Sequence, residues 1–150
     1  MRRASLLRHR DRRGCEKTPV DSSIAGAPLY RACHVDQAAR PAGRQPLPDF
    51  TPVTSEIRDG ACFRANFEFV VSALGVPEVE SIRQVSATNA RHAAAVEAII
   101  PLMRYRPAYL NGVAARQVVE YRHNATVRTV SSRTQSIGGP GVGGMRVARC

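Results

Sequence analysis

The feature that most constrains this chain is the dipeptide Asn111-Gly112, which lies between two strand-like runs. Both residues adopt positive φ angles at little cost, so the pair predicts a tight β-hairpin. The first arm contains Pro107, which has no amide donor, so we expect an edge strand or a strand entry there. In the second arm, residues 116–123, the side chains follow a pattern with a period of two, which predicts a strand with two distinct faces. One face would carry Gln117, Val119, Tyr121 and His123, and the other Arg116, Val118, Glu120 and Arg122.

A second run, Cys62 to Ser72, has the clearest strand pattern of the chain. Its apolar positions alternate with mostly polar ones, as in a strand with one buried face. Aromatic stripes with a period of two usually pack against a helix, so we interpret this face as core and not as a ligand-stacking surface. A weaker strand pattern follows near residues 79–86, after a turn at Gly75. The buried face would hold three of the four phenylalanines, Phe63, Phe67 and Phe69.

The next segment favours a helix that runs to about Leu102, with N-cap candidates between Ser86 and Asn89. Pro101 should loosen or end its last turn, because proline lacks the backbone donor. We expect the helix to lie across the sheet against the phenylalanine face. The apolar stripe would contain Ala90, Ala93, Val96, Ile99, Ile100 and Met103, and the outward-pointing residues would be Arg91, His92 and Glu97.

Together these elements predict the α+β class, with a small three-stranded antiparallel sheet packed by one main helix. A short N-terminal helix would have Thr51 as its N-cap and Pro52 in the first helical position, where the missing donor costs nothing. We place the domain at residues 46–124. Residues 1–45 are expected to form a disordered Arg-rich region and a Pro-containing lead-in, and residues 125–150 a flexible Ser/Gly-rich tail.

The charge of the chain is concentrated outside the predicted domain. The net charge is +10, yet residues 45–124 hold eight Arg against eight Asp and Glu. The excess therefore lies in the flanks, +6 in residues 1–44 and +4 in residues 125–150. A basic chain suggests a nucleic-acid or anionic-surface binder acting through its Arg-rich tails, and this is our alternative hypothesis. The segment expected to fold supplies no net positive field, so we do not expect a specific nucleic-acid partner.

No pattern in the sequence predicts catalysis, a cofactor or a metal site. No nucleophile stands beside a base, and no pair of carboxylates is placed for acid-base work. The four histidines, His9, His34, His92 and His123, share no ligand spacing. The Gly-rich run at residues 138–144 lacks the Lys-Ser/Thr and the preceding strand of a phosphate-binding loop. We therefore predict a binding protein and not an enzyme.

The four cysteines, Cys15, Cys33, Cys62 and Cys150, show no C-x-x-C spacing. A Cys33–Cys62 bridge is one possibility in an oxidising compartment, and unpaired or buried thiols are the other. No run of 18 or more apolar residues occurs, and the N-terminus lacks the apolar core of a secretory signal.

One combination of features resembles a known family. The run Tyr105-Arg106-Pro107-Ala108, a gap, Asn111-Gly112 and an alternating strand is similar to the C-terminal domain of the TonB family of energy-transducing proteins. The likeness continues upstream through strand, Gly turn, strand and helix in that order. It covers roughly residues 46–124, about half of the chain.

The resemblance implies an adaptor that captures a short extended peptide of an outer-membrane transporter by pairing it with the last strand. Such adaptors transmit force from inner-membrane motor proteins driven by the proton gradient, through an N-terminal membrane anchor. The implied location is the periplasmic face of the cell envelope, and the missing anchor suggests a different start or a detached member. A second copy is the alternative partner for an exposed strand, which would give a homodimer. The implied partner-binding residues are Arg116, Gln117, Val118, Val119, Glu120 and Tyr121.

Overall fold

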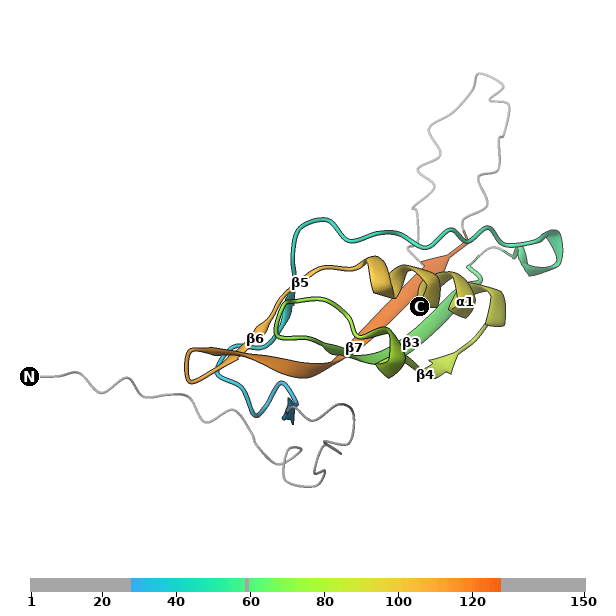
Figure 1. Ribbon diagram of the computed structural model, residues 1–150. Coiled ribbons are helices and arrows are strands. Elements are labelled where there is room, and N and C mark those ends of the chain that lie inside the picture. Colours follow the sequence, from blue (N-terminus) through green and yellow to red (C-terminus); the bar gives the residue numbers. More distant parts are fainter. Residues whose placement is uncertain (1–27, 59, 128–150) are drawn as a thin grey trace, which may run out of the picture.

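The structure is a computed structural model that describes residues 28–58 and 60–127. It is a mixed α+β fold in which one main helix covers one face of a curled sheet (Figure 1). The centre of the sheet is the antiparallel pair of β3 (Cys62–Val71) and β7 (Val113–Thr126). These strands pair without interruption from Cys62 opposite Thr126 to Val71 opposite Gln117. The two long alternating runs of the sequence therefore form one ribbon.

Three short strands complete a five-stranded sheet, where the sequence predicted three strands. β4 (Arg83–Ala87) lies on the far edge of β3, and β1 (Leu29–Tyr30) runs parallel to β7 on the edge away from β3. β6 (Ala108–Leu110) forms the hairpin with β7. β6 is the first arm of the predicted hairpin, whereas β1 was not predicted, because a strand of two residues is too short to show alternation.

The predicted hairpin turn is confirmed. Asn111 has φ 51° and Gly112 has φ 76°, the positive values that a type I′ turn requires at both central positions. Leu110 and Val113 pair directly on either side of it. Pro107 separates β6 from β5 (Tyr105–Arg106), so the first arm is broken at the residue without an amide donor.

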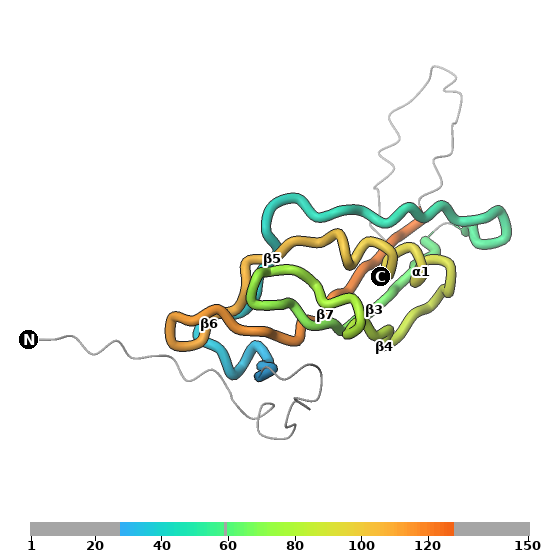
Figure 2. The backbone as a smooth tube through the Cα atoms, in the orientation of Figure 1, coloured from blue at the N-terminus to red at the C-terminus, as the bar shows by residue number. Residues whose placement is uncertain are grey.

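The segment assigned to the lead-in belongs to the fold, which corrects our domain boundary at residue 46. β1 lies within it, and β2 (Arg40–Pro41) pairs with β5 in a separate two-stranded sheet. From there the chain runs beside α1 (Figure 2), and the Phe50 ring lies 4.9 Å from the ring of His92 in that helix. The Phe50 ring contacts the ring of Phe63 on β3 at a centroid distance of 5.1 Å. Our predictions of disorder for residues 1–27 and of a flexible tail for residues 128–150 lie outside the described residues.

The main helix is α1 (Ala90–Ile99), followed by the 3-10 turn η4 (Ile100–Leu102) that contains Pro101. Asn89 is the N-cap, and its side-chain oxygen accepts a hydrogen bond from the His92 amide at 2.9 Å. The helix packs against β3 and β4. The largest buried side chains of the core are Phe67, Phe69, Ile100, Met103, Val71 and Val96.

Two local predictions were wrong in form. The expected N-terminal helix is one 3-10 turn, η2 (Thr54–Glu56), and its N-cap is Val53 and not Thr51. The Glu56 carboxylate accepts from the Val53 amide at 2.9 Å, and this bond, followed by one from Asn89, holds the Glu56 pKa below its usual value. Three residues cannot sustain an α-helix without tertiary contacts.

The strand expected at residues 79–86 begins only at Arg83, because residues 79–81 form the 3-10 turn η3 (Val79–Ser81). The Ser81 hydroxyl donates to the Glu78 carbonyl at 2.6 Å and accepts from the Val70 amide at 2.8 Å. A serine side chain that bonds nearby backbone groups competes with the strand ladder, which explains the turn.

Candidate functional site

The candidate site is the edge of β7 that faces away from β3, which we call the outer edge. On this edge β1 pairs with only two residues, since Leu29 lies opposite Arg116 and Tyr30 opposite Gln117. From Val118 to Asn124 no strand within residues 28–58 and 60–127 pairs with the outer edge. Among the described residues, a seven-residue stretch of a central strand is therefore open on one side.

The backbone direction along β7 follows from hydrogen bonds at both ends of β3. The Val70 amide donates to Ser81 Oγ, and its carbonyl accepts from the Glu78 amide, both at 2.8 Å. The backbone amide and carbonyl of Val70 therefore point away from β7. Val118 lies opposite Val70, and in an antiparallel ladder two such residues form a non-hydrogen-bonded pair. The Val118 backbone groups consequently point to the outer edge.

The backbone of β3 has the same orientation at the other end of the strand, at Arg64. Arg64 bonds Thr88 through its amide at 2.8 Å and its carbonyl at 2.9 Å, so it also points away from β7. Asn124, opposite Arg64, must then point outward. The alternation places Glu120 and Arg122 in the same orientation. The amides and carbonyls of Glu120, Arg122 and Asn124 thus face outward, without a backbone partner in the described part of the chain.

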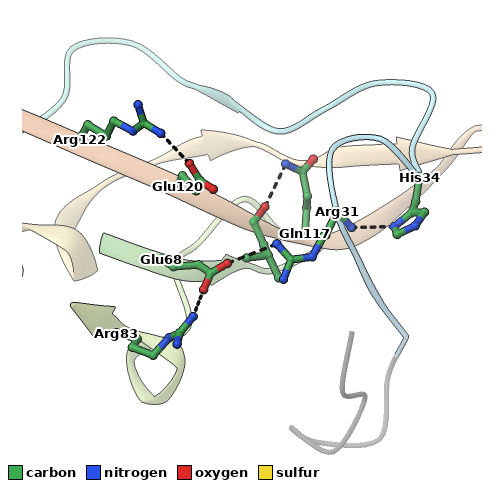
Figure 3. Close-up of polar contacts among 8 residues, drawn as sticks. Arg31, His34, Glu68, Arg83, Gln117, Glu120 and Arg122 are labelled. Atoms are coloured by element: carbon green, nitrogen blue, oxygen red, sulfur yellow. Dashed lines mark hydrogen bonds and ion pairs between the residues drawn. The ribbon is translucent and has the colours of Figure 1, made fainter. Parts of the chain in front are cut away.

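The side chains beside the outer edge carry charge. Glu120 and Arg122 are 63% and 72% exposed, and they form an ion pair at 3.2 Å. Behind them, Glu68 of β3 holds Arg31 at 3.4 Å and also pairs with Arg83 (Figure 3). We call this side of the sheet, away from α1, the polar face. A hollow of about 310 Å³ on it is lined by Asn66, Phe67, Glu68, Arg83, Val85, Glu120 and Arg122.

Arg31 is a special member of the polar face. It follows directly after β1, and its guanidinium reaches Glu68 from there. Its Nε donor is buried and makes no hydrogen bond within the described residues. Buried donors are nearly always paired in folded proteins, so this one marks a place where an acceptor is missing.

Two of the predicted partner-binding residues are part of the fold. The Arg116 guanidinium bonds Glu78 through Nε at 2.7 Å and through a terminal nitrogen at 2.5 Å, and its side chain is 10% exposed. These bonds to Glu78 raise the Arg116 pKa. Gln117 is 3% exposed and accepts from the Ala39 amide at 2.8 Å. Both side chains are engaged inside the domain.

The other four predicted residues divide between the two faces as expected. Val119 and Tyr121 lie on the helix side, where they pack against the core while partly exposed. Val118 and Glu120 lie on the polar face, and the Val118 carbonyl accepts from the Gln117 side chain at 3.3 Å. Of the predicted set, Glu120 is the residue that combines outward backbone groups with an exposed side chain.

The motif Tyr105-Arg106-Pro107-Ala108 serves the fold and not the open edge. The Tyr105 amide donates to the Gly75 carbonyl at 2.8 Å, which ties β5 to the turn after β3. Tyr105 is buried against Phe69, and this burial raises its pKa to about 12. Ala108 is fully buried. Together with Asn111-Gly112, the motif sets the register in which β7 starts.

The sequence analysis missed one cluster. His92 is fully buried, which corrects our prediction that it points outward, and its Nε2 lies 3.0 Å from His123 Nδ1. A signal existed, because position 92 precedes Val96, Ile99 and Met103 at helical spacing and therefore belongs to the apolar stripe. Burial lowers the pKa of both imidazoles, and for His92 the neighbouring His123 lowers it further.

Cys33 and Cys62 are both disulfide-bonded, but not to each other. Cys62 lies opposite Thr126, whereas Tyr30, three residues before Cys33, lies opposite Gln117 at the other end of the ribbon. Nine strand residues span about 30 Å, and disulfide-bonded Cα atoms lie within about 7 Å. The bridge considered in the sequence analysis is therefore excluded. Cys15 and Cys150 lie outside the described residues.

Comparison with known proteins yields no assignment: no model of a protein family matches the chain, and no curated protein matches its sequence. Within residues 28–58 and 60–127, no group of three or more His, Cys, Asp or Glu side chains is arranged to hold a metal ion. The helices in the same ranges are all too short to cross a membrane.

Proposed function

We propose that this domain is a TonB-type adaptor that binds an extended peptide by adding it as a strand to the outer edge of β7. The observation that carries the proposal is the outward orientation of the Glu120, Arg122 and Asn124 backbones on an open edge. Backbone pairing of this kind gives affinity with little demand on the sequence of the guest peptide.

We place the pairing further along β7 than the sequence suggested. β1 already occupies the outer edge at Arg116 and Gln117, so a guest strand would begin beyond Tyr30 and run beside residues 118–124. Three outward residues offer six backbone groups, each worth about 0.5 to 1.5 kcal/mol net. Part of this gain offsets the ordering of the peptide, so the isolated interaction should be weak and reversible.

The proposed partner is a segment of an outer-membrane transporter, and the proposed force comes from a proton-driven motor in the inner membrane. The resemblance of the hairpin motif to TonB-family domains supports this choice of partners. The two disulfide-bonded cysteines support an oxidising compartment such as the periplasm, since such bonds are rare where thiols are kept reduced.

The test uses a labelled octapeptide of alternating Thr and Val as the probe and the full chain as the receptor. We expect binding by fluorescence polarisation, together with slower hydrogen exchange of the Glu120, Arg122 and Asn124 amides. Arg122→Pro should abolish binding, because it removes an outward donor that the β3 ladder does not use. Arg122→Ala keeps this donor and is the matched control, which should still bind.

Equal binding by the proline and alanine variants would refute strand addition at this edge. An oligonucleotide of random sequence tests the alternative function. Phosphate binding by the Arg-rich flanks should collapse between low and moderate salt, whereas backbone pairing should persist.

A further inference from the structure

We infer that the preferred guest is an extended segment in which acidic residues alternate with apolar ones. The inference rests on the proposed function, since it concerns the side chains of the peptide that pairs with β7. Side chains directly opposite each other in neighbouring strands point to the same face and interact there. Guest residues opposite Glu120 and Arg122 would therefore project onto the polar face, and the residues between them onto the helix side.

The polar face carries an excess of positive charge. Its three carboxylates, Glu68, Glu78 and Glu120, are each already paired with arginine. Its basic members outnumber them by two, so acidic guest residues would be attracted and basic ones repelled. The basic members are Arg31, Arg64, Arg83, Arg116 and Arg122.

The position of Arg31 strengthens the argument. β1 ends at Tyr30, and a guest strand would continue the same row along β7, directly past the Arg31 side chain. The buried Nε of Arg31 lacks an acceptor in the described structure. A carboxylate on the first polar-face residue of the guest would supply one, and hydrogen bonds between charged partners are the stronger kind.

The helix side of the edge selects for apolar residues. Val119 and Tyr121 are only partly buried there, and both pack against the core of the domain. Burial raises the pKa of the Tyr121 hydroxyl, as expected in apolar surroundings. A charged guest residue on this side would lose hydration without gaining a partner. The two faces together define the alternating pattern.

The experiment compares three labelled octapeptides that share Val at alternate positions and carry Glu, Gln or Lys at the others. Binding to the full chain is measured at about 0.15 M salt, where the screening length is about 8 Å and distant charges count little. We expect the Glu peptide to bind about five- to tenfold more tightly than the Lys peptide, with the Gln peptide between them.

Charge reversal assigns the preference to the polar face. Arg122→Glu should remove or invert the preference for Glu over Lys, and Arg122→Gln should reduce it. Arg44→Glu makes the same charge change at an exposed position in the loop after β2, off the polar face, and should leave the preference unchanged.

The outcomes separate this inference from the function on which it rests. If the three peptides bind equally and Arg122→Pro still abolishes binding, charge selection is wrong while strand addition stands. If Arg44→Glu lowers the preference as much as Arg122→Glu does, the selectivity belongs to the overall charge of the chain and the inference fails. If no peptide binds, the proposed function fails too.

Discussion

His92 Nε2 and His123 Nδ1 lie 3.0 Å apart, and this contact joins helix α1 directly to strand β7. One ring must donate and the other accept, so at least one of the two imidazoles must be neutral for the hydrogen bond to form. The rings of Phe50 and Phe63 flank His92, and the His92 side chain is fully buried. The hydrogen bond is thus enclosed by aromatic groups that cannot stabilise an added charge through hydration.

The first prediction concerns pH. Both imidazoles have pKa values below the ordinary 6.5, so the unfolded chain binds protons more readily than the folded one. The contribution of the pair to stability is complete above pH 6.5 and falls as the pH drops below that value. Urea unfolding at pH 7.5 and 5.5 measures the loss. His123→Gln keeps a polar partner without titrating, and should show a smaller difference between the two pH values.

The second prediction concerns the turn after β3. A Cβ on Gly75 would lie 2.0 Å from the Tyr105 carbonyl oxygen, and Gly75 has a φ of +79°. We expect Gly75→Ala to cost about 3 kcal/mol or more, because backbone strain is joined by a clash that forces β5 away. Gly112→Ala has a similar φ of +76° with nothing within 4 Å, and should cost only about 1 kcal/mol. Equal losses on chemical unfolding would contradict the assigned clash.

The third prediction contrasts two arginines of β7. Arg116 bonds Glu78 through two nitrogens and is 10% exposed, whereas Arg122 is 72% exposed and bonds Glu120 once. Arg116→Ala leaves a partly buried carboxylate without its partner and should cost about 2 kcal/mol or more. Arg122→Ala should cost less than about 0.5 kcal/mol. Thermal unfolding of the two variants gives the comparison, and a reversed order would show that the Glu78 pair is not structural.

The fourth prediction concerns disulfide connectivity. The register of β1 and β3 on β7 puts Cys33 and Cys62 near opposite ends of the ribbon. Tryptic digestion without reductant should therefore yield no product that links residues 32–44 to residues 59–64. Mass spectrometry detects such a link directly, and reduced and alkylated protein is the control. Its detection would mean that the strand pairing assigned to β1 or β3 is incorrect.

Predictions from local pattern succeeded where one segment carries its own signal. The apolar alternation of Cys62 to Ser72 identified β3, and the N-cap candidates at residues 86–89 indicated the start of α1, where Asn89 is the cap. The predictions failed where contacts with residues distant in the sequence determine the structure. Ser81 turns the chain by bonding Val70, and the ring partners of His92, which are His123 and Phe50, come from segments distant in the sequence.

The sequence by itself determined the hairpin at Asn111-Gly112 and the two faces of β7, because positive φ angles and a period of two are properties of neighbouring residues. Only the tertiary structure decided how much of β7 stays open. β1 comes from a segment more than 80 residues away in the chain and covers just Arg116 and Gln117. A two-residue pairing leaves no local trace in a sequence. The pairing of β1 with β7 places the open edge of β7 at residues 118–124, because each position on a strand edge pairs with only one neighbouring strand at a time.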